Sequence, residues 1–266
     1  MPVLFLSHGA PSLLLEAGQT GQSWRELAAQ LPRPASILVV SAHWETQIPT
    51  ASRAMMPVTI HDFSGFAEAL YKFHYAAPGA PQLAEMVVAA LRQAKIEAAL
   101  DDTRGLDHGA WIPLALMYPE ADIPVAQLSI QPKRNAAWHI ELGRALRPLR
   151  EAGVLIVCSG AITHNLRAIF RHPAGESAPE WVTEFCNWIA DRIAAGDIAA
   201  LAEYRNLAPH AVQNHPSDEH LLPLFVALGA ADRIDRSRHV NQVMTYCLLA
   251  MDAWLFEPLS STESVL

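Results

Sequence analysis

Short, uninterrupted runs of apolar residues constrain the fold of this chain more than any other feature of its sequence. "VLFLS" (3–7), "SILVVSA" (36–42) and "VLIVCSG" (154–160) are largely continuous rather than alternating apolar with polar residues. Strands of this composition are buried on both faces, as in a sheet that carries helices on either side. Segments with helical periodicity separate them, so the sequence predicts an α/β fold with a largely parallel sheet.

The same patterns predict the remaining elements. Further strands are expected at 95–101 and 123–130, and one long strand at 243–256. Helices are expected at 21–31, 65–73, 80–94, 109–118, 135–150, 179–194 and 218–229. We therefore expect one domain over residues 1–258, with a central, largely parallel or mixed sheet flanked by helices on both faces. The polar tail, residues 259–266, is expected to be frayed.

The last predicted helix has readable ends. Ser217 or Asp218 is expected to cap its N-terminus, and Gly229 to end it. This placement puts His220 in the first turn of the helix. An imidazolium is poorly placed at a helix N-terminus, so His220 is either an ordinary surface residue or a neutral metal ligand.

Composition narrows the class of protein. The chain is 51% hydrophobic and 17% charged over 266 residues, which is enough to build a large core. The formal net charge is −8 without a basic stripe, and no apolar run is long enough to span a membrane, so nucleic acid and membranes are poor partners. Its three cysteines form no CxxC pair, which is typical of reduced thiols. We expect a cytoplasmic protein that acts on a small molecule.

Three of the twelve histidines follow predicted strands at the edge where open α/β sheets bind ligands. His8, His43 and His164 each stand at or just after such a strand end. Each one alone could equally be a loop histidine that bonds to the backbone, but together they predict imidazoles converging on one crevice. His108, which follows Asp107, is either a neighbour of a helix cap or a donor to substrate.

Motifs of other catalytic classes are absent from the sequence. There is no GxSxG, Walker loop, GxGxxG or HExxH. A histidine-rich metal centre remains, and imidazole suits zinc, iron, copper or nickel. The histidines expected on the surface or on a helix face are His139, His172, His210, His215 and His239.

Eight blocks of sequence, in order over roughly residues 3–256, resemble the motif series of the DOPA-type extradiol dioxygenases, which belong to the class III extradiol superfamily. The blocks are "LFLSHGAPS", "ILVVSAHWET", "TIHDFSGFAEALY", "HYAAPGAP", "GLDHGAW", "DIPVAQLSI", "SGAITHNL" and "DEHLLPLFVALGA". The resemblance implies oxygen-dependent opening of the ring of a catechol, L-DOPA or a related compound, to give a muconic semialdehyde.

The resemblance also implies a site with one divalent metal per chain. Its ligands map onto His8, His43 and His220. His164 maps onto the acid–base histidine beside the metal, or onto an additional ligand, and His108 onto a second active-site histidine that faces substrate. Fe(II) is implied for ring cleavage, whereas an all-histidine set also suits Zn(II), which we expect as an occupant of the isolated protein.

The substrate wall is expected to include Trp44, His61 and Phe63, although His61 could equally be structural. Arg53 or Arg167 could bind an amino-acid carboxylate. Two alternatives stay open at this point. One is a zinc-dependent hydrolase in which the same histidines activate water, and the other is a non-enzymatic metal-binding member of the same superfamily.

Overall fold

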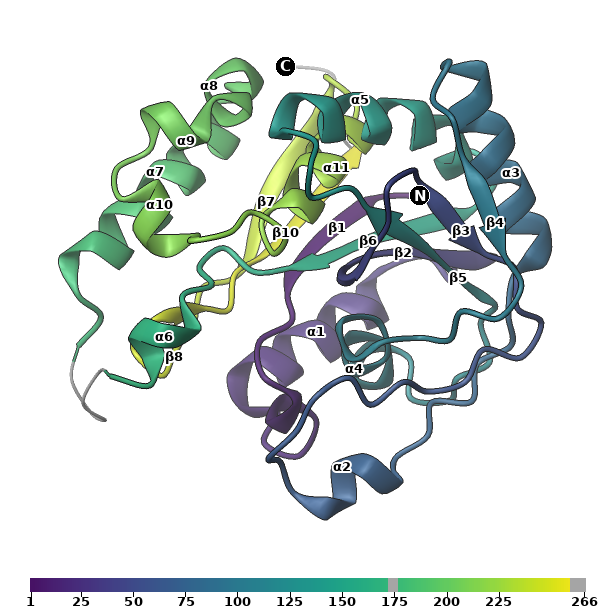
Figure 1. The fold of residues 1–266 in the computed structure, drawn as a ribbon, viewed down its shortest axis with the longest axis horizontal. Coiled ribbons are helices and arrows are strands. Elements are labelled where there is room, and N and C mark those ends of the chain that lie inside the picture. Colours follow the sequence, from purple (N-terminus) through teal and green to yellow (C-terminus); the bar gives the residue numbers. More distant parts are fainter. Residues whose placement is uncertain (172–176, 259–266) are drawn as a thin grey trace.

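The structure is a computed structural model that describes residues 1–171 and 177–258 (Figure 1). The predicted tail and His172 lie outside the described residues. One mixed sheet has the strand order β4-β3-β5-β2-β6-β1-β10-β7, and β8 pairs with β9 in a small separate ribbon. The strands are β1 (Val3–Ser7), β2 (Ser36–Glu45), β3 (Thr50–Ser52), β4 (Ala99–Asp101), β5 (Val125–Ile130), β6 (Val154–Gly160), β7 (Asp235–Asn241), β8 (Met244–Thr245), β9 (Leu249–Ala250) and β10 (Ala253–Pro258).

Helices cover both faces of this sheet, as predicted, and the sheet separates two apolar clusters (Figure 1). Val3 and Phe5 of β1 belong to the cluster under α3, α5 and α11, whereas Leu4 and Leu6 belong to the cluster under α1 and α4. The longer helices are α1 (Gly18–Gln30), α3 (Pro81–Gln93), α4 (His108–Met117), α5 (Ala136–Leu146), α7 (Glu180–Ala194) and α11 (Leu222–Ala230). The shorter ones are α2 (Glu68–Lys72), α6 (Leu166–Ile169), α8 (Ile198–Ala202), α9 (Tyr204–Leu207) and α10 (Ala211–Asn214), with 3-10 turns at Pro11–Leu14 and Arg147–Arg150.

The centre of the sheet is parallel and its edges are not. β5, β2, β6 and β1 run parallel, whereas β10 is antiparallel to β1 and β7 is antiparallel to β10. The carboxyl ends of β1, β2 and β6 therefore reach the same edge of the sheet, which is where the fold collects their following residues.

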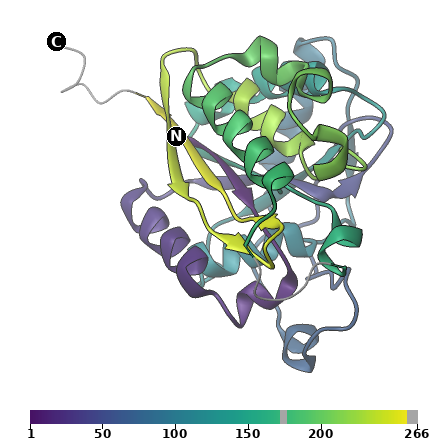
Figure 2. The same ribbon diagram turned by 90° about the vertical axis from the view of Figure 1, so that its left-hand side faces the viewer.

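The prediction of one strand over 243–256 is wrong. The chain reverses between β8 and β9 through Tyr246 and Cys247, both with positive φ, and then enters β10. Figure 2 shows this yellow C-terminal ribbon along one side of the molecule. The run contains no glycine or proline that would have indicated the turn. The 95–101 strand is also shorter than predicted, because only Ala99–Asp101 pairs.

The predicted ends of the last helix are wrong as well. α11 begins at Leu222 with Pro223 in its first turn, and no side chain caps it. The Asp218 carboxylate instead accepts from the Tyr204 hydroxyl at 2.6 Å. Gly229 lies inside the helix, where a Cβ would stand 2.0 Å from the carbonyl oxygen of Ile140 on α5. Glycine therefore serves close packing of two helices here and not helix termination.

None of the helices within the described ranges is both long and apolar enough to cross a bilayer.

Candidate metal centre

Five histidines from separate segments meet at the carboxyl edge of the parallel strands. His8 follows β1, His43 lies near the end of β2, His164 follows β6, His108 is the first residue of α4, and His220 precedes α11. All five line one cavity of about 870 Å³. The convergence predicted for the strand-end histidines is thus present, and His108 and His220 join it from helix starts.

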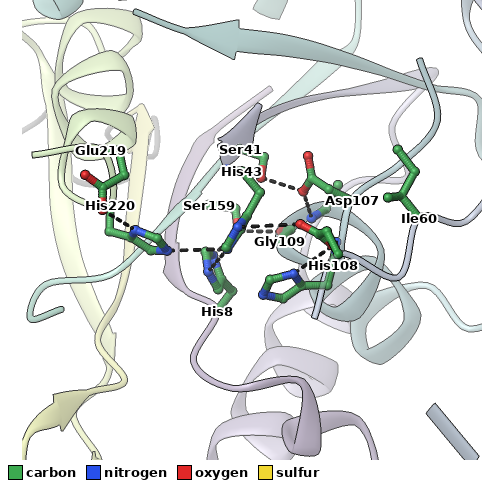
Figure 3. Close-up of polar contacts among 12 residues, drawn as sticks. His8, Ser41, His43, Ile60, Asp107, His108, Gly109, Ser159, Glu219 and His220 are labelled. Atoms are coloured by element: carbon green, nitrogen blue, oxygen red, sulfur yellow. Dashed lines mark hydrogen bonds and ion pairs between the residues drawn. The ribbon is translucent and has the colours of Figure 1, made fainter. Parts of the chain in front are cut away.

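Three of these rings direct their Nε2 atoms toward one another (Figure 3). The Nε2 atoms of His8 and His43 are 3.0 Å apart, and those of His43 and His220 are 3.3 Å apart. Two nitrogens bound to one metal at about 2.1 Å with angles of 90–109° lie ~3.0–3.4 Å from each other. These two distances therefore match those between neighbouring ligands of a single ion.

The Nδ1 atoms show which tautomer each ring adopts. The Nδ1 of His8 is 2.9 Å from the Ser159 hydroxyl, which itself donates to the Gly109 carbonyl, so the imidazole must donate to Ser159. The Nδ1 of His220 is 3.1 Å from the Glu219 carboxylate. With the proton on Nδ1 both rings present a bare Nε2 lone pair. The Nε2 of His43 faces both of these lone pairs and can donate at most one proton, so at least one of the two contacts joins lone pairs that repel. A bound cation would turn this repulsion into attraction, so the residues fit a metal.

Asp62 links the second pair of histidines. Its Oδ1 accepts from both the backbone N–H and the Nδ1 of His108, at 3.0 and 2.9 Å, and its Oδ2 is 3.5 Å from the Nδ1 of His43. Burial raises the pKa of Asp62, but the hydrogen bonds from His108 outweigh this effect and lower it to about 2. Asp62 is therefore an anion that orients two rings of the site.

His108 offers a second way to group the ligands. One nitrogen from each of His8, His43 and His108 lies within 4.8 Å of the others. A similar group joins His220 with His164 and Glu219. The ring of His108 packs against that of His43 with centroids 3.9 Å apart, whereas the ring of His164 stacks on His220 at 3.3 Å and 12°.

The backbone of His220 leaves no room for a side chain at Gly160, the last residue of β6. A Cβ on Gly160 would stand 2.2 Å from the His220 carbonyl oxygen, and the same oxygen accepts from the Ala161 N–H at 2.8 Å. The small residues of "SGAI" thus allow the turn that carries His220 to touch the end of β6. This close approach sets the position of His220 relative to the strand-end histidines.

A buried polar network supports His43. The Ser41 hydroxyl accepts from the His43 backbone N–H and donates to Asp107, which caps α4. Arg104 donates to Asp107 at 2.9 Å and to the His43 carbonyl at 3.2 Å. One carboxylate therefore ties the end of β2 to the start of the helix that bears His108.

Burial keeps four of these imidazoles neutral, those of His8, His43, His164 and His220. Loss of water is the largest cause lowering the pKa of His43 and His164, each to about 4. It also lowers the pKa of His8 and His220, with neighbouring histidines contributing next, His43 for His8 and His164 for His220. A neutral ring is the form that binds metal or accepts a proton.

Only one of the three residues predicted to form the substrate wall lines the cavity. Phe63 lines it. Trp44 does not, because it is buried beneath the Arg104 guanidinium, whose carbon is 5.2 Å from the ring centroid. His61 is not among the described lining residues; its ring centroid is 5.9 Å from that of Phe63, and one ring nitrogen is 3.0 Å from the Phe73 carbonyl oxygen.

Sequence reasoning did not single out Asp62 or Ser159. Asp62 directly follows His61 in "TIHDF", but a lone carboxylate in a loop carries no signal of its partner. Ser159 sits within an apolar strand, and a buried hydroxyl that faces a strand-end histidine could have suggested it.

Comparison with known proteins identifies relatives over almost the whole chain. Residues 2–250 match the family described as the catalytic LigB subunit of aromatic ring-opening dioxygenase. A 4,5-DOPA dioxygenase extradiol of Mirabilis jalapa is 41% identical, with 91% of this chain and 93% of that protein covered. A protein of the same name from Escherichia coli K12 is 44% identical, with 87% and 86% covered.

A crystal structure of an uncharacterized protein from Escherichia coli K12 superposes with a TM-score of 0.81 at 36% sequence identity. The match covers 96% of this chain and 99% of that one. The mixed sheet and its helical layers are therefore shared with an experimental structure.

Proposed function

The chain belongs to the family of the catalytic LigB subunit of aromatic ring-opening dioxygenase, and we propose that its histidine cluster is the metal centre of an extradiol dioxygenase acting on DOPA-type catechols. Members of this family are metal-dependent enzymes that cleave the aromatic ring. The reaction joins one catechol with one O₂. Both oxygen atoms enter the product, the bond between a hydroxyl-bearing carbon and its unsubstituted neighbour breaks, and a muconic semialdehyde results.

His8, His43 and His220 are the proposed metal ligands. The observation that supports this set most strongly is the spacing of 3.0 and 3.3 Å between successive Nε2 atoms. His108 is left outside the set because its ring packs against that of His43, with centroids 3.9 Å apart, and the family resemblance assigns it to the substrate. A divalent metal held here would lower the pKa of catechol hydroxyls, and Fe(II), unlike Zn(II), can also exchange electrons with O₂.

His164 is proposed as the acid–base residue. Its ring lines the cavity beside His220, and its lowered pKa of about 4 leaves it neutral and able to take a proton from a catechol hydroxyl. The Glu219 carboxylate, 3.8 Å from its Nδ1, stabilises the charged ring that results. The same ring then returns the proton as the ring-opened product forms.

His108 is proposed to bind the substrate from the opposite side of the cavity. Asp62 accepts from its Nδ1, which leaves the other ring nitrogen, bare in this tautomer, to accept a hydrogen bond from a catechol hydroxyl in the cavity that His108 lines. The side chains of His8, His108 and His220 are buried, so a catechol bound against them exchanges its protons with the histidines beside it.

Family membership favours the dioxygenase over the two alternatives left open by the sequence, a zinc hydrolase and a non-enzymatic metal-binding protein. The native metal is proposed to be iron, with zinc as a resting occupant. A cytoplasmic location is part of the proposal, supported by Cys158 and Cys186, which form no disulfide.

Anaerobic reconstitution with Fe(II), followed by an oxygen electrode and a panel of catechols, tests this function. We expect one O₂ consumed per catechol and a yellow semialdehyde product, with no turnover by the zinc-loaded protein. Consumption of substrate without O₂ would contradict the proposal and support the hydrolase.

A further inference from the structure

The cavity extends well beyond the five histidines. Its volume is about 870 Å³, whereas a cavity of about 150 Å³ already holds benzene. The side chains that line it away from the imidazoles are mostly hydrocarbon and come from several segments of the chain. They include Pro11, Phe63, Phe66, Leu166, Ile169 and Phe170. A catechol at the histidines therefore leaves space for a larger group on its ring, and that group meets an apolar surface.

Part of this surface is unusually open to solvent. Phe170, Tyr246 and Leu166 line the cavity with 86%, 54% and 47% of their surface exposed. Large apolar side chains gathered in this way mark a surface that a ligand covers. Covering them with an apolar group removes hydrocarbon from water and is favourable, whereas covering them with a charged group is not.

Among the described residues that line the cavity there is no lysine or arginine that could pair with an anionic substituent. The Asp62 carboxylate is the acidic group among the described lining residues, and it is already bonded to His108. Of the two arginines suggested by the sequence, Arg53 pairs with Asp102 away from the cavity, and Arg167 is exposed and not part of the lining.

We propose that this enzyme selects catechols whose ring carries an uncharged apolar substituent, such as an alkyl or aryl group, over catechols whose substituent is charged. A zwitterionic side chain would give up water and find no opposite charge among the described lining residues. The inference rests on the proposed function and leaves its chemistry unchanged, because the substituent does not take part in ring cleavage.

The sharpest comparison uses two catechols whose side chains branch in the same way. In 4-isobutylcatechol two methyl groups replace the ammonium and carboxylate of L-DOPA. Calorimetry of the iron-loaded enzyme without oxygen measures binding of each, and oxygen uptake measures kcat/KM. We expect 4-isobutylcatechol to bind about tenfold more tightly or better and to have a correspondingly higher kcat/KM. Equal binding, or a preference for L-DOPA, would overturn the inference.

A gain of charge tests the same point from the side of the protein. Ile169→Arg places a cation at the cavity wall and should shift the preference toward L-DOPA. Val212→Arg is the matched control, because Val212 is 61% exposed on α10 and does not line the cavity. An unchanged preference in Ile169→Arg would count against the inference.

The two levels of the proposal fail separately. If L-DOPA is cleaved as efficiently as its apolar analogue, the selectivity is wrong and the dioxygenase function stands. If the apolar compound binds better but no catechol consumes oxygen, the selectivity stands and the dioxygenase function is wrong.

Discussion

The Nε2 atoms of His43 and His220 lie 3.3 Å apart although the two residues are 177 positions apart in the chain. Neither fold element brings this about alone. β2 carries His43 to the edge of the sheet, and the contact of His220 with Gly160 brings the turn before α11 to the same edge. The Nε2 of His43 also faces that of His8, so His43 is in contact with both of the other proposed ligands.

Replacing the ligands one at a time should separate the two candidate groupings. We expect His8→Ala, His43→Ala and His220→Ala each to lower metal affinity by more than about 100-fold, because each removes a ligand and not an outer contact. His108→Ala should keep its metal. Elemental analysis after dialysis against a metal buffer measures this. Retention by His220→Ala together with loss by His108→Ala would instead assign the site to His8, His43 and His108.

Ser159 should act on the metal through His8. Ser159→Ala removes the acceptor of the His8 Nδ1 proton, so the ring loses its fixed tautomer and orientation. Metal affinity should fall about 10–100-fold, the usual effect of losing such an outer contact. Ser129→Ala is the control, since Ser129 is equally buried but bonds to Thr46 and Thr50. Equal affinities in the two variants would remove this role from Ser159.

His164→Gln should separate catalysis from metal binding. The variant should keep its iron, whereas kcat at equal iron loading should fall by about 10²–10⁴-fold, the usual contribution of a general acid–base residue. His210→Gln serves as control, because His210 is partly exposed and pairs with Glu184. Loss of iron from His164→Gln would make His164 a ligand, and undiminished turnover would show that another group moves the proton.

The sequence predicts the parts of this molecule that depend on local pattern. Continuous apolar runs predict the strands that are buried on both faces. The convergence of His8, His43 and His164 is predicted because the carboxyl ends of parallel strands lie at one edge of the sheet. The particular set of metal ligands was predicted only from the resemblance to a family. Sequence periodicity does not predict contacts between residues as far apart in the chain as His43 and His220.

The parts that were missed depend on contacts formed only in the folded chain. The turn at Tyr246 and Cys247 adopts positive φ without glycine, so no turn residue indicated that 243–256 would reverse. Trp44 follows a site histidine, yet its strand position buries it under Arg104 and away from the cavity. Being next to His43 in the sequence therefore did not place Trp44 in the substrate wall.

His139 and His215 are more deeply buried than the sequence predicts. Both were predicted on the surface or on a helix face, and both side chains are fully buried. His139 lies on α5, where its Nδ1 donates to the Asn135 carbonyl at 2.9 Å and its Nε2 accepts from the Gln131 N–H at 3.3 Å. Because the Nε2 of His139 accepts this hydrogen bond, it carries no proton, and the pair of contacts suits only the neutral imidazole.

The buried neutral state of His139 should make the stability of the protein fall in mild acid. Burial lowers the pKa of His139 to about 4, whereas an unfolded histidine titrates near its ordinary value of about 6.5. Between these values the unfolded chain binds the extra proton, so stability is complete above pH 6.5 and is lost as the pH falls toward 4. From pH 7 to pH 5 this one residue should contribute a loss of about 2 kcal/mol in the free energy of unfolding.

Urea unfolding of the parent and of His139→Gln across this pH range isolates the effect. The variant has no titratable group at this position, so its stability should fall by about 2 kcal/mol less than that of the parent between pH 7 and pH 5, even if it is less stable at both. Protonation of the metal-site histidines affects both proteins alike and cancels in the difference. Parallel stability curves would mean that His139 either is not neutral in the folded protein or titrates equally in both states.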